Sequence, residues 1–121
     1  MAKKLTIQEK ARRLWVRALR SGKYGWGTGE LRPDKNKYCC LGVLCEVAIK
    51  QGIIGKYNPA AGGLTAYPKV MEWVGLIEPT GVFDDSSLAD INDDALRNPF
   101  KKIANLIEKE PDGLFINKEQ E

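Results

Sequence analysis

The segment from Cys40 to Gln51 constrains the fold more than any other part of the chain. Its apolar residues surround most of a helix, and Gly52 stands just past its end. A helix that is apolar on nearly every side has to be buried, and the apolar run of residues 39–49 is about half of the roughly 20 residues needed to span a bilayer. This segment is therefore expected to be the buried central helix of a soluble domain and not a transmembrane span.

The N-terminal part predicts an amphipathic helix. Thr6, with Glu9 three residues later, forms a capping-box pattern, and Ser21 with Gly22 supplies the stop. The apolar residues in between follow helical spacing, so they are expected on one face with the cations opposite. The apolar face consists of Ile7, Ala11, Leu14, Trp15, Ala18 and Leu19, and the basic face of Lys10, Arg12, Arg13, Arg17 and Arg20.

The remaining chain predicts shorter elements. Residues 53–67 contain Pro59 and three glycines and are expected to form a long loop. Residues 33–36 favour a turn, after which residues 37–39 are expected to run back alongside residues 30–32 as a small hairpin. Further helices are expected from Pro68 to a stop at Gly75, from Ser87 to Asn92, and from Asn98, as N-cap, to just before Pro111.

These elements indicate an α+β fold, a mainly helical single domain of four to five helices with a small antiparallel β-hairpin. It covers residues 1–121, and residues 111–121 are expected to be a C-terminal tail that either frays as a flexible end or docks. With 121 residues, of which 43% are hydrophobic and 29% charged, the chain has the size and composition of one globular domain. Its three cysteines are odd in number and lie within seven positions, which favours reduced thiols and a cytoplasmic location.

Charge is divided unevenly along the chain. Residues 1–40 carry 11 Lys and Arg against 3 Asp and Glu, a net +8, whereas residues 41–121 carry 8 against 13, a net −5. A basic half can face nucleic acid or an acidic partner. It can also be neutralised within the fold, when the basic first helix packs beside acidic loops of the second half.

The chain contains no histidine. This removes the usual general base, the Ser–His and Cys–His nucleophile pairs and the commonest zinc ligand. The three cysteines cannot supply the four ligands of a structural zinc site; we expect buried thiols, with a reactive thiol near a helix N-terminus as the alternative. Helix caps and turns account for the acidic residues Asp84, Asp85, Asp90, Asp93 and Asp94, so neither a metal nor another cofactor is expected.

The segment from Tyr24 to Gly29 is the candidate binding site. Its glycines allow a ligand to approach the backbone closely, and Tyr24 and Trp26 offer rings on which a nucleobase can stack, while Arg20 or Arg32 can hold an anion. The alternative is a glycine-rich edge that lets the hairpin bend over the first helix. The predicted ligand-binding residues are Arg17, Arg20, Tyr24, Trp26 and Arg32, with Arg17 as an outlying contact.

Short motifs are spread along most of the chain, and the most distinctive is Tyr-Cys-Cys-Leu-Gly-Val-Leu-Cys at residues 38–45. The others are Trp15, Ala18 to Gly22 and Tyr24; Gly27, Gly29, Leu31 and Arg32; Pro68, Val70, Trp73, Gly75 and Leu76; Leu88, Ala89, Ile91, Asn92 and Asp93; and Ile103, Ala104, Ile107 and Glu108. Together they resemble a family of small proteins of unknown function encoded by bacteriophages and prophages. The resemblance implies a viral setting, in which small proteins often bind or sequester host molecules, and it implies no particular activity.

The size, the missing histidine and the resemblance predict a non-enzymatic accessory protein that binds and sequesters a host molecule in the host cytoplasm. The molecule would be a nucleotide-like signal or a protein of a defence pathway. The alternative is a nucleic-acid-binding protein that uses the basic first helix, although no recognisable nucleic-acid module accompanies that helix. An enzyme that uses carboxylates or a cysteine ranks last. No membrane contact is expected, and the sequence leaves open whether the chain forms a homo-oligomer.

Overall fold

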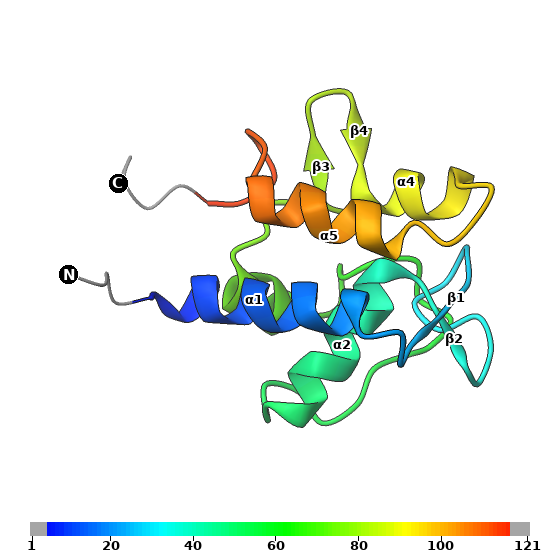
Figure 1. Ribbon diagram of the computed structural model, residues 1–121. Helices are drawn as coiled ribbons and strands as arrows, with labels where there is room; N and C mark the ends of the chain where they lie inside the picture. Colours follow the sequence, from blue (N-terminus) through cyan, green and yellow to red (C-terminus); the bar gives the residue numbers. More distant parts are fainter. Residues whose placement is uncertain (1–4, 117–121) are drawn as a thin grey trace.

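The computed structural model describes residues 5–116, and in this range it contains five helices and two pairs of short strands (Figure 1). The mainly helical α+β fold predicted from the sequence is confirmed. The helices are α1 Ile7–Arg20, α2 Cys40–Lys50, α3 Pro68–Val74, α4 Leu88–Asp94 and α5 Phe100–Lys109. The strands are β1 Gly25–Trp26, β2 Lys37–Tyr38, β3 Val82–Phe83 and β4 Ser86–Ser87.

The central helix is α2, as the sequence predicts. α1, α3 and α4 all pack against it, and its first six residues are all buried. Leu31 crosses α2 so closely that a Cβ added to Gly42 would lie 1.8 Å from the Leu31 carbonyl oxygen. None of the helices in residues 5–116 combines the length and the hydrophobicity needed to cross a bilayer.

The buried face of α1 differs from the predicted one. The capping box is confirmed, because Glu9 N–H donates to Thr6 Oγ1 and Thr6 N–H donates to Glu9 Oε1. Ile7, however, is 68% exposed, whereas Val16 and Arg12 are buried. The prediction for Arg12 is wrong because α1 has neighbours on two sides: it packs on α2 and α3, and also on α5. The residues buried as predicted are Ala11, Trp15 and Leu19.

The starts and ends of the later helices follow the predicted local signals. Ser87 Oγ accepts the N–H of Asp90 at 3.1 Å and so caps α4. α5 begins at Phe100 with Pro99 as its N-cap, so the prediction of Asn98 as N-cap is wrong by one residue, although Asn98 Oδ1 accepts the N–H of Phe100 at 2.9 Å. α3 ends at Gly75, whose φ of 83° is in the left-handed region that favours glycine.

The predicted pairing of residues 37–39 with residues 30–32 is wrong. Only one backbone bond of such a pair is present among the described residues, from Cys39 N–H to the Leu31 carbonyl at 3.0 Å. The Leu31 N–H donates instead to the Ala61 carbonyl at 2.7 Å, because the long loop lies against this segment. The loop competes for the backbone groups that the hairpin would have used.

Strand β2 pairs with β1 in parallel, with Gly25 opposite Lys37. This approach needs glycine, since a Cβ on Gly25 would lie 2.4 Å from the Asn36 carbonyl oxygen. The antiparallel hairpin of the fold is formed by β3 and β4, which project from the helices (Figure 1). Its two-residue turn contains Asp84 at a φ of 49°.

The loop and the C-terminal segment both contribute to the core. Residues 53–67 contain neither helix nor strand, yet Leu64 within them is fully buried. Of the two alternatives for the C-terminal tail, docking holds for Leu114 and Phe115, which are buried, and Phe115 forms a β-bridge with Leu76. The rest of the predicted tail, residues 117–121, lies outside the described residues.

Candidate functional site

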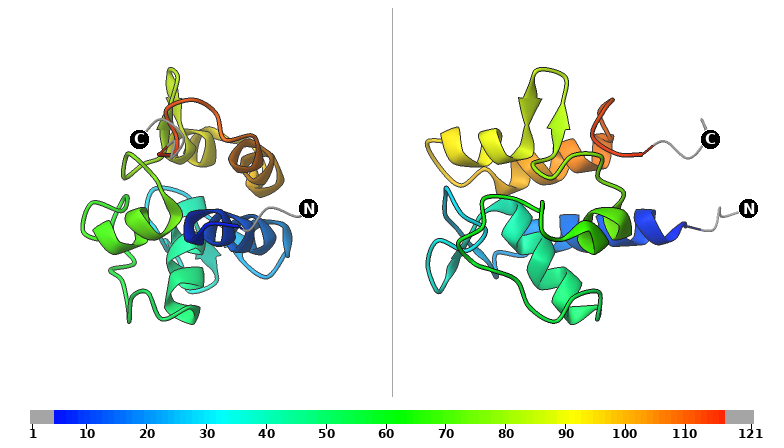
Figure 2. Two further views of the ribbon diagram at one scale, coloured as in Figure 1. Left: turned by 90° about the vertical axis from the view of Figure 1, so that its left-hand side faces the viewer. Right: turned by 180° about the vertical axis from the view of Figure 1, so that it is seen from behind.

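A groove of about 720 Å³ lies between α1 and α5. These two helices form the most extensive helix–helix contact and run side by side in opposite directions (Figures 1 and 2). The volume lies within the range of small-molecule sites, roughly 300–1,000 Å³. We call this feature the α1–α5 groove. Its lining residues are Glu9, Arg12, Arg13, Val16, Arg17, Arg20 and Ser21 on the α1 side, and Ile107, Glu108 and Glu110 on the α5 side.

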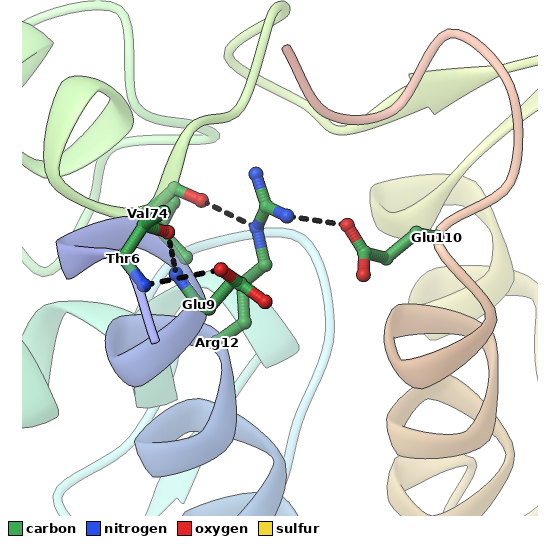
Figure 3. A network of polar contacts seen from close by, with 5 residues as sticks. All are labelled: Thr6, Glu9, Arg12, Val74 and Glu110. Carbon is green, nitrogen blue, oxygen red and sulfur yellow. Dashed lines mark hydrogen bonds and ion pairs between the residues drawn. The ribbon is translucent and has the colours of Figure 1, made fainter. Parts of the chain in front are cut away.

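Towards the start of α1 the groove is lined by Arg12, whose contacts with Val74 and Glu110 are drawn in Figure 3. Its Nε donates to the Val74 carbonyl at the end of α3 at 2.9 Å, and its guanidinium forms an ion pair with Glu110. The guanidinium carbon also lies 4.0 Å from the centre of the Phe115 ring. Burial lowers the pKa of Arg12, and Glu110 opposes this shift. Arg12 thus joins three segments of the chain and has a structural role at this end.

Towards the end of α1 the groove is lined by Arg20. Its two terminal nitrogens donate to the two carboxylate oxygens of Glu108 at 2.5 and 3.0 Å, and one of them also donates to Asn105 Oδ1 at 2.7 Å. Such a two-pronged pairing is the geometry in which a guanidinium binds carboxylates and phosphates best. The hydrogen bond from Arg20 lowers the pKa of Glu108, so this carboxylate stays ionised at neutral pH.

Arg13 and Arg17 occupy the middle of the groove. Both are exposed, and neither forms a hydrogen bond or an ion pair with any residue of the range 5–116 that the structure describes. They stand one helical turn apart on the same stripe of α1 and can contact one ligand together. Below them the buried side chains of Val16 and Ile107 form an apolar floor. Four arginines against three glutamates make the groove net positive.

The structure divides the five residues that the sequence predicts as a binding site. Arg17 and Arg20 line the α1–α5 groove, whereas Tyr24, Trp26 and Arg32 do not. Arg13 and Glu108 are groove residues that the predicted site missed. Arg13 was recognisable, because it lies four residues before Arg17 on the basic face, but nothing in the sequence marks Glu108 as a neighbour of α1.

Tyr24 and Arg32 both contact Tyr38. The rings of Tyr24 and Tyr38 meet edge to face with their centroids 5.3 Å apart, and the Arg32 guanidinium carbon lies 5.1 Å from the Tyr38 ring centre. Lys50 Nζ donates to Tyr24 Oη at 3.0 Å. The aromatic faces and cations of this segment therefore already contact one another, which leaves less of them for a ligand.

Trp26 and its flanking glycines make contacts within the fold. The Trp26 indole N–H donates to the Asn92 carbonyl at 3.0 Å, and the Asn92 side chain donates to the Gly27 carbonyl at 2.9 Å. A Cβ on Gly27 would lie 2.5 Å from the Pro33 ring. These contacts favour the alternative stated for this segment, in which the glycines permit close backbone packing. Asn92 also accepts the N–H of Cys40 at 3.1 Å, and so joins α4 to the start of α2.

The three cysteines are buried and unbonded to one another, as predicted for inert thiols. Burial raises the pKa of the Cys45 thiol to about 12 and that of Cys40 well above its ordinary value. Cys39 caps α2 by accepting the N–H of Gly42 through its sulfur. Between residues 5 and 116, no group of three or more His, Cys, Asp or Glu side chains is arranged to hold a metal ion.

Comparison with known families identifies the family of the chain. The family described as Domain of unknown function (DUF8296) matches residues 7–111, a range that includes both walls of the α1–α5 groove. The comparison with curated proteins found no match, and neither did the comparison with solved structures. Because the matched range covers most of its length, the chain belongs to the DUF8296 family, whose function is unknown.

Proposed function

We propose that the protein binds a phosphate-bearing, nucleotide-like ligand in the α1–α5 groove and acts by sequestering it. The observation that carries the proposal is the pair Arg13 and Arg17, two exposed guanidinium groups without a hydrogen-bond partner in the described part of the chain, over an apolar floor. Guanidinium groups match phosphate oxygens in charge and geometry. The groove has the volume for a nucleotide, and its floor suits a base or a sugar.

Binding without catalysis fits the chemistry of the side chains. The chain has no histidine, and burial raises the pKa of all three thiols, which disfavours a reactive thiolate. Arg20 lowers the pKa of Glu108, so the groove carboxylate bonded to Arg20 is a weak base. The groove thus offers charges for holding an anion.

The test is isothermal titration calorimetry with ADP, inorganic pyrophosphate and adenosine. We expect ADP and pyrophosphate to bind, adenosine to bind much more weakly, and Arg13→Ala/Arg17→Ala to lose at least about tenfold in affinity, since two charge-assisted contacts disappear. The matched control is Arg97→Ala/Lys101→Ala, which removes two exposed cations elsewhere. Unchanged affinity in the groove variant, or an equal loss in the control, would exclude the groove as the site.

The resemblance to small bacteriophage proteins supports a host molecule as the ligand and the host cytoplasm as the place of action. If that is so, the protein isolated from its native host should carry the molecule with it. Mass spectrometry of the small molecules released by heating should then find a phosphorylated compound, present with the wild type and depleted with Arg13→Ala/Arg17→Ala. Equal amounts from both proteins would contradict the sequestering role.

Nucleic acid is the second candidate ligand, because Lys10, Arg13 and Arg17 are all exposed along α1. A gel-shift titration with a labelled oligonucleotide at two salt concentrations distinguishes the two. Contacts to several phosphates require affinity to fall steeply with salt, and a protein that binds only nucleotides gives no shift.

A further inference from the structure

We infer that Glu108 is an internal competitor for the α1–α5 groove: it occupies the Arg20 guanidinium that an incoming phosphate also uses, and the ligand has to displace it. The inference rests on the proposed function and concerns how the same site is regulated. Glu108 raises the concentration that any anion needs in order to bind. Weakly held small anions are thereby excluded, while a ligand with additional contacts still enters.

The geometry of the pair matches that of a bound ligand. Two oxygens of Glu108 accept from the two terminal nitrogens of Arg20, at 2.5 and 3.0 Å. A phosphate would bind the same two nitrogens in the same way. Asn105 accepts from Arg20 at 2.7 Å and holds the guanidinium at the groove in either state. Arg17 lies three residues earlier on the same stripe of α1, so one phosphate can reach both arginines.

The pair is also exposed enough to exchange. The side chains of Arg20 and Glu108 are 38% and 53% exposed, whereas Arg12 at the other end is 11% exposed and is held by three segments. An exposed ion pair changes the equilibrium constant between its paired and unpaired states by at most about fivefold. The free-energy cost of displacing Glu108 is therefore small enough for a ligand to offset, whereas the cost of displacing Glu110 from the buried Arg12 is not. The Arg12–Glu110 pair is therefore held in place, whereas the Arg20–Glu108 pair can exchange.

The test is a pyrophosphate titration of wild type, Glu108→Gln and Arg20→Ala, together with the Arg20→Ala/Glu108→Gln double variant. We expect Glu108→Gln to bind about fivefold more tightly than wild type, because the competing charge is gone. Glu72→Gln, which removes an exposed carboxylate of α3 outside the groove, should bind as wild type does. In the Arg20→Ala background, Glu108→Gln should change affinity by less than about twofold, since the two effects are coupled through one contact.

Each outcome decides the matter. An equal gain in affinity from Glu108→Gln in both backgrounds would mean that Glu108 acts only through its charge. No gain in affinity in the wild-type background would mean that Glu108 does not compete with the ligand. Either result overturns the inference and leaves the proposed function standing. If no variant binds pyrophosphate, Glu108→Gln included, the proposed function fails and the inference fails with it.

Discussion

Gly42 lies inside α2, where the usual preference of helices for alanine would make Gly42→Ala stabilising by about 1 kcal/mol. The structure predicts the opposite sign. The added Cβ would lie 1.8 Å from the Leu31 carbonyl oxygen and 2.7 Å from its carbon. Leu31 cannot simply move away, because it is fully buried and its backbone is bonded to Cys39 at 3.0 Å and to Ala61 at 2.7 Å. Overpacking costs about 1–3 kcal/mol, and one lost buried bond adds about 1–3 kcal/mol. Against the gain of about 1 kcal/mol from helix preference, we expect a net loss of about 3 kcal/mol.

Urea unfolding followed by tryptophan fluorescence measures this loss. The matched control is Gly55→Ala, since a Cβ at Gly55 meets nothing within 4 Å and its φ is not positive. We expect the control to stay within about 0.5 kcal/mol of wild type. If Gly42→Ala also stays within about 1 kcal/mol of wild type, the close crossing of Leu31 over α2 is wrong, and with it the reason for a glycine in the middle of this helix.

Three further predictions concern the core, a turn and the thiols. Asn92→Ala should lower the free energy of unfolding by about 3 kcal/mol, because the Cys40 N–H and the Gly27 carbonyl lose their buried partner; a loss below about 1 kcal/mol in urea unfolding would contradict this. Asp84→Gly should raise stability by about 0.5 kcal/mol and increase the melting temperature, because Asp84 has a φ of 49° that glycine adopts without strain; a lower melting temperature would argue against the turn. Burial raises the pKa of Cys45 to about 12, so native thiols keep a proton that unfolded thiols lose, and stability should decline as the pH rises above about 8.5. A thiol-reactive dye should correspondingly label the native protein slowly and the protein in urea fast, and equal rates would refute the burial of the thiols.

The parts of the fold that could be predicted are those whose signals are local. The bonds of Thr6 with Glu9 and of Ser87 with Asp90 each span three residues, so the sequence itself displays both partners. The burial of α2 follows from its composition. A helix that is apolar on nearly every side avoids water only when the rest of the chain surrounds it. Strand pairing depends on residues that are distant in the sequence. The Ala61 carbonyl accepts the N–H of Leu31, and no residue near position 31 predicts this hydrogen bond.

The candidate site was predictable to a similar extent. Spacing identified the basic stripe of α1, and with it Arg17 and Arg20. The partners of that stripe were not visible, since Glu108 lies 88 residues from Arg20 and Glu110 lies 98 residues from Arg12. Arginine is also ambiguous in a helical pattern, because its long apolar stem lets it be buried where its charge is paired. The pattern therefore places Arg12 on the exposed face, although it is buried.

The walls of the α1–α5 groove come from the first and the last helix of the described chain. The groove therefore exists only after α5 has been synthesised and has docked, so that an incomplete chain on the ribosome has no site to fill. A ligand that contacts both walls would in turn stabilise the packing of α1 against α5. Amide hydrogen exchange in α1 and in α5 should then slow together when the ligand binds, even though nearly eighty residues separate the two helices along the chain.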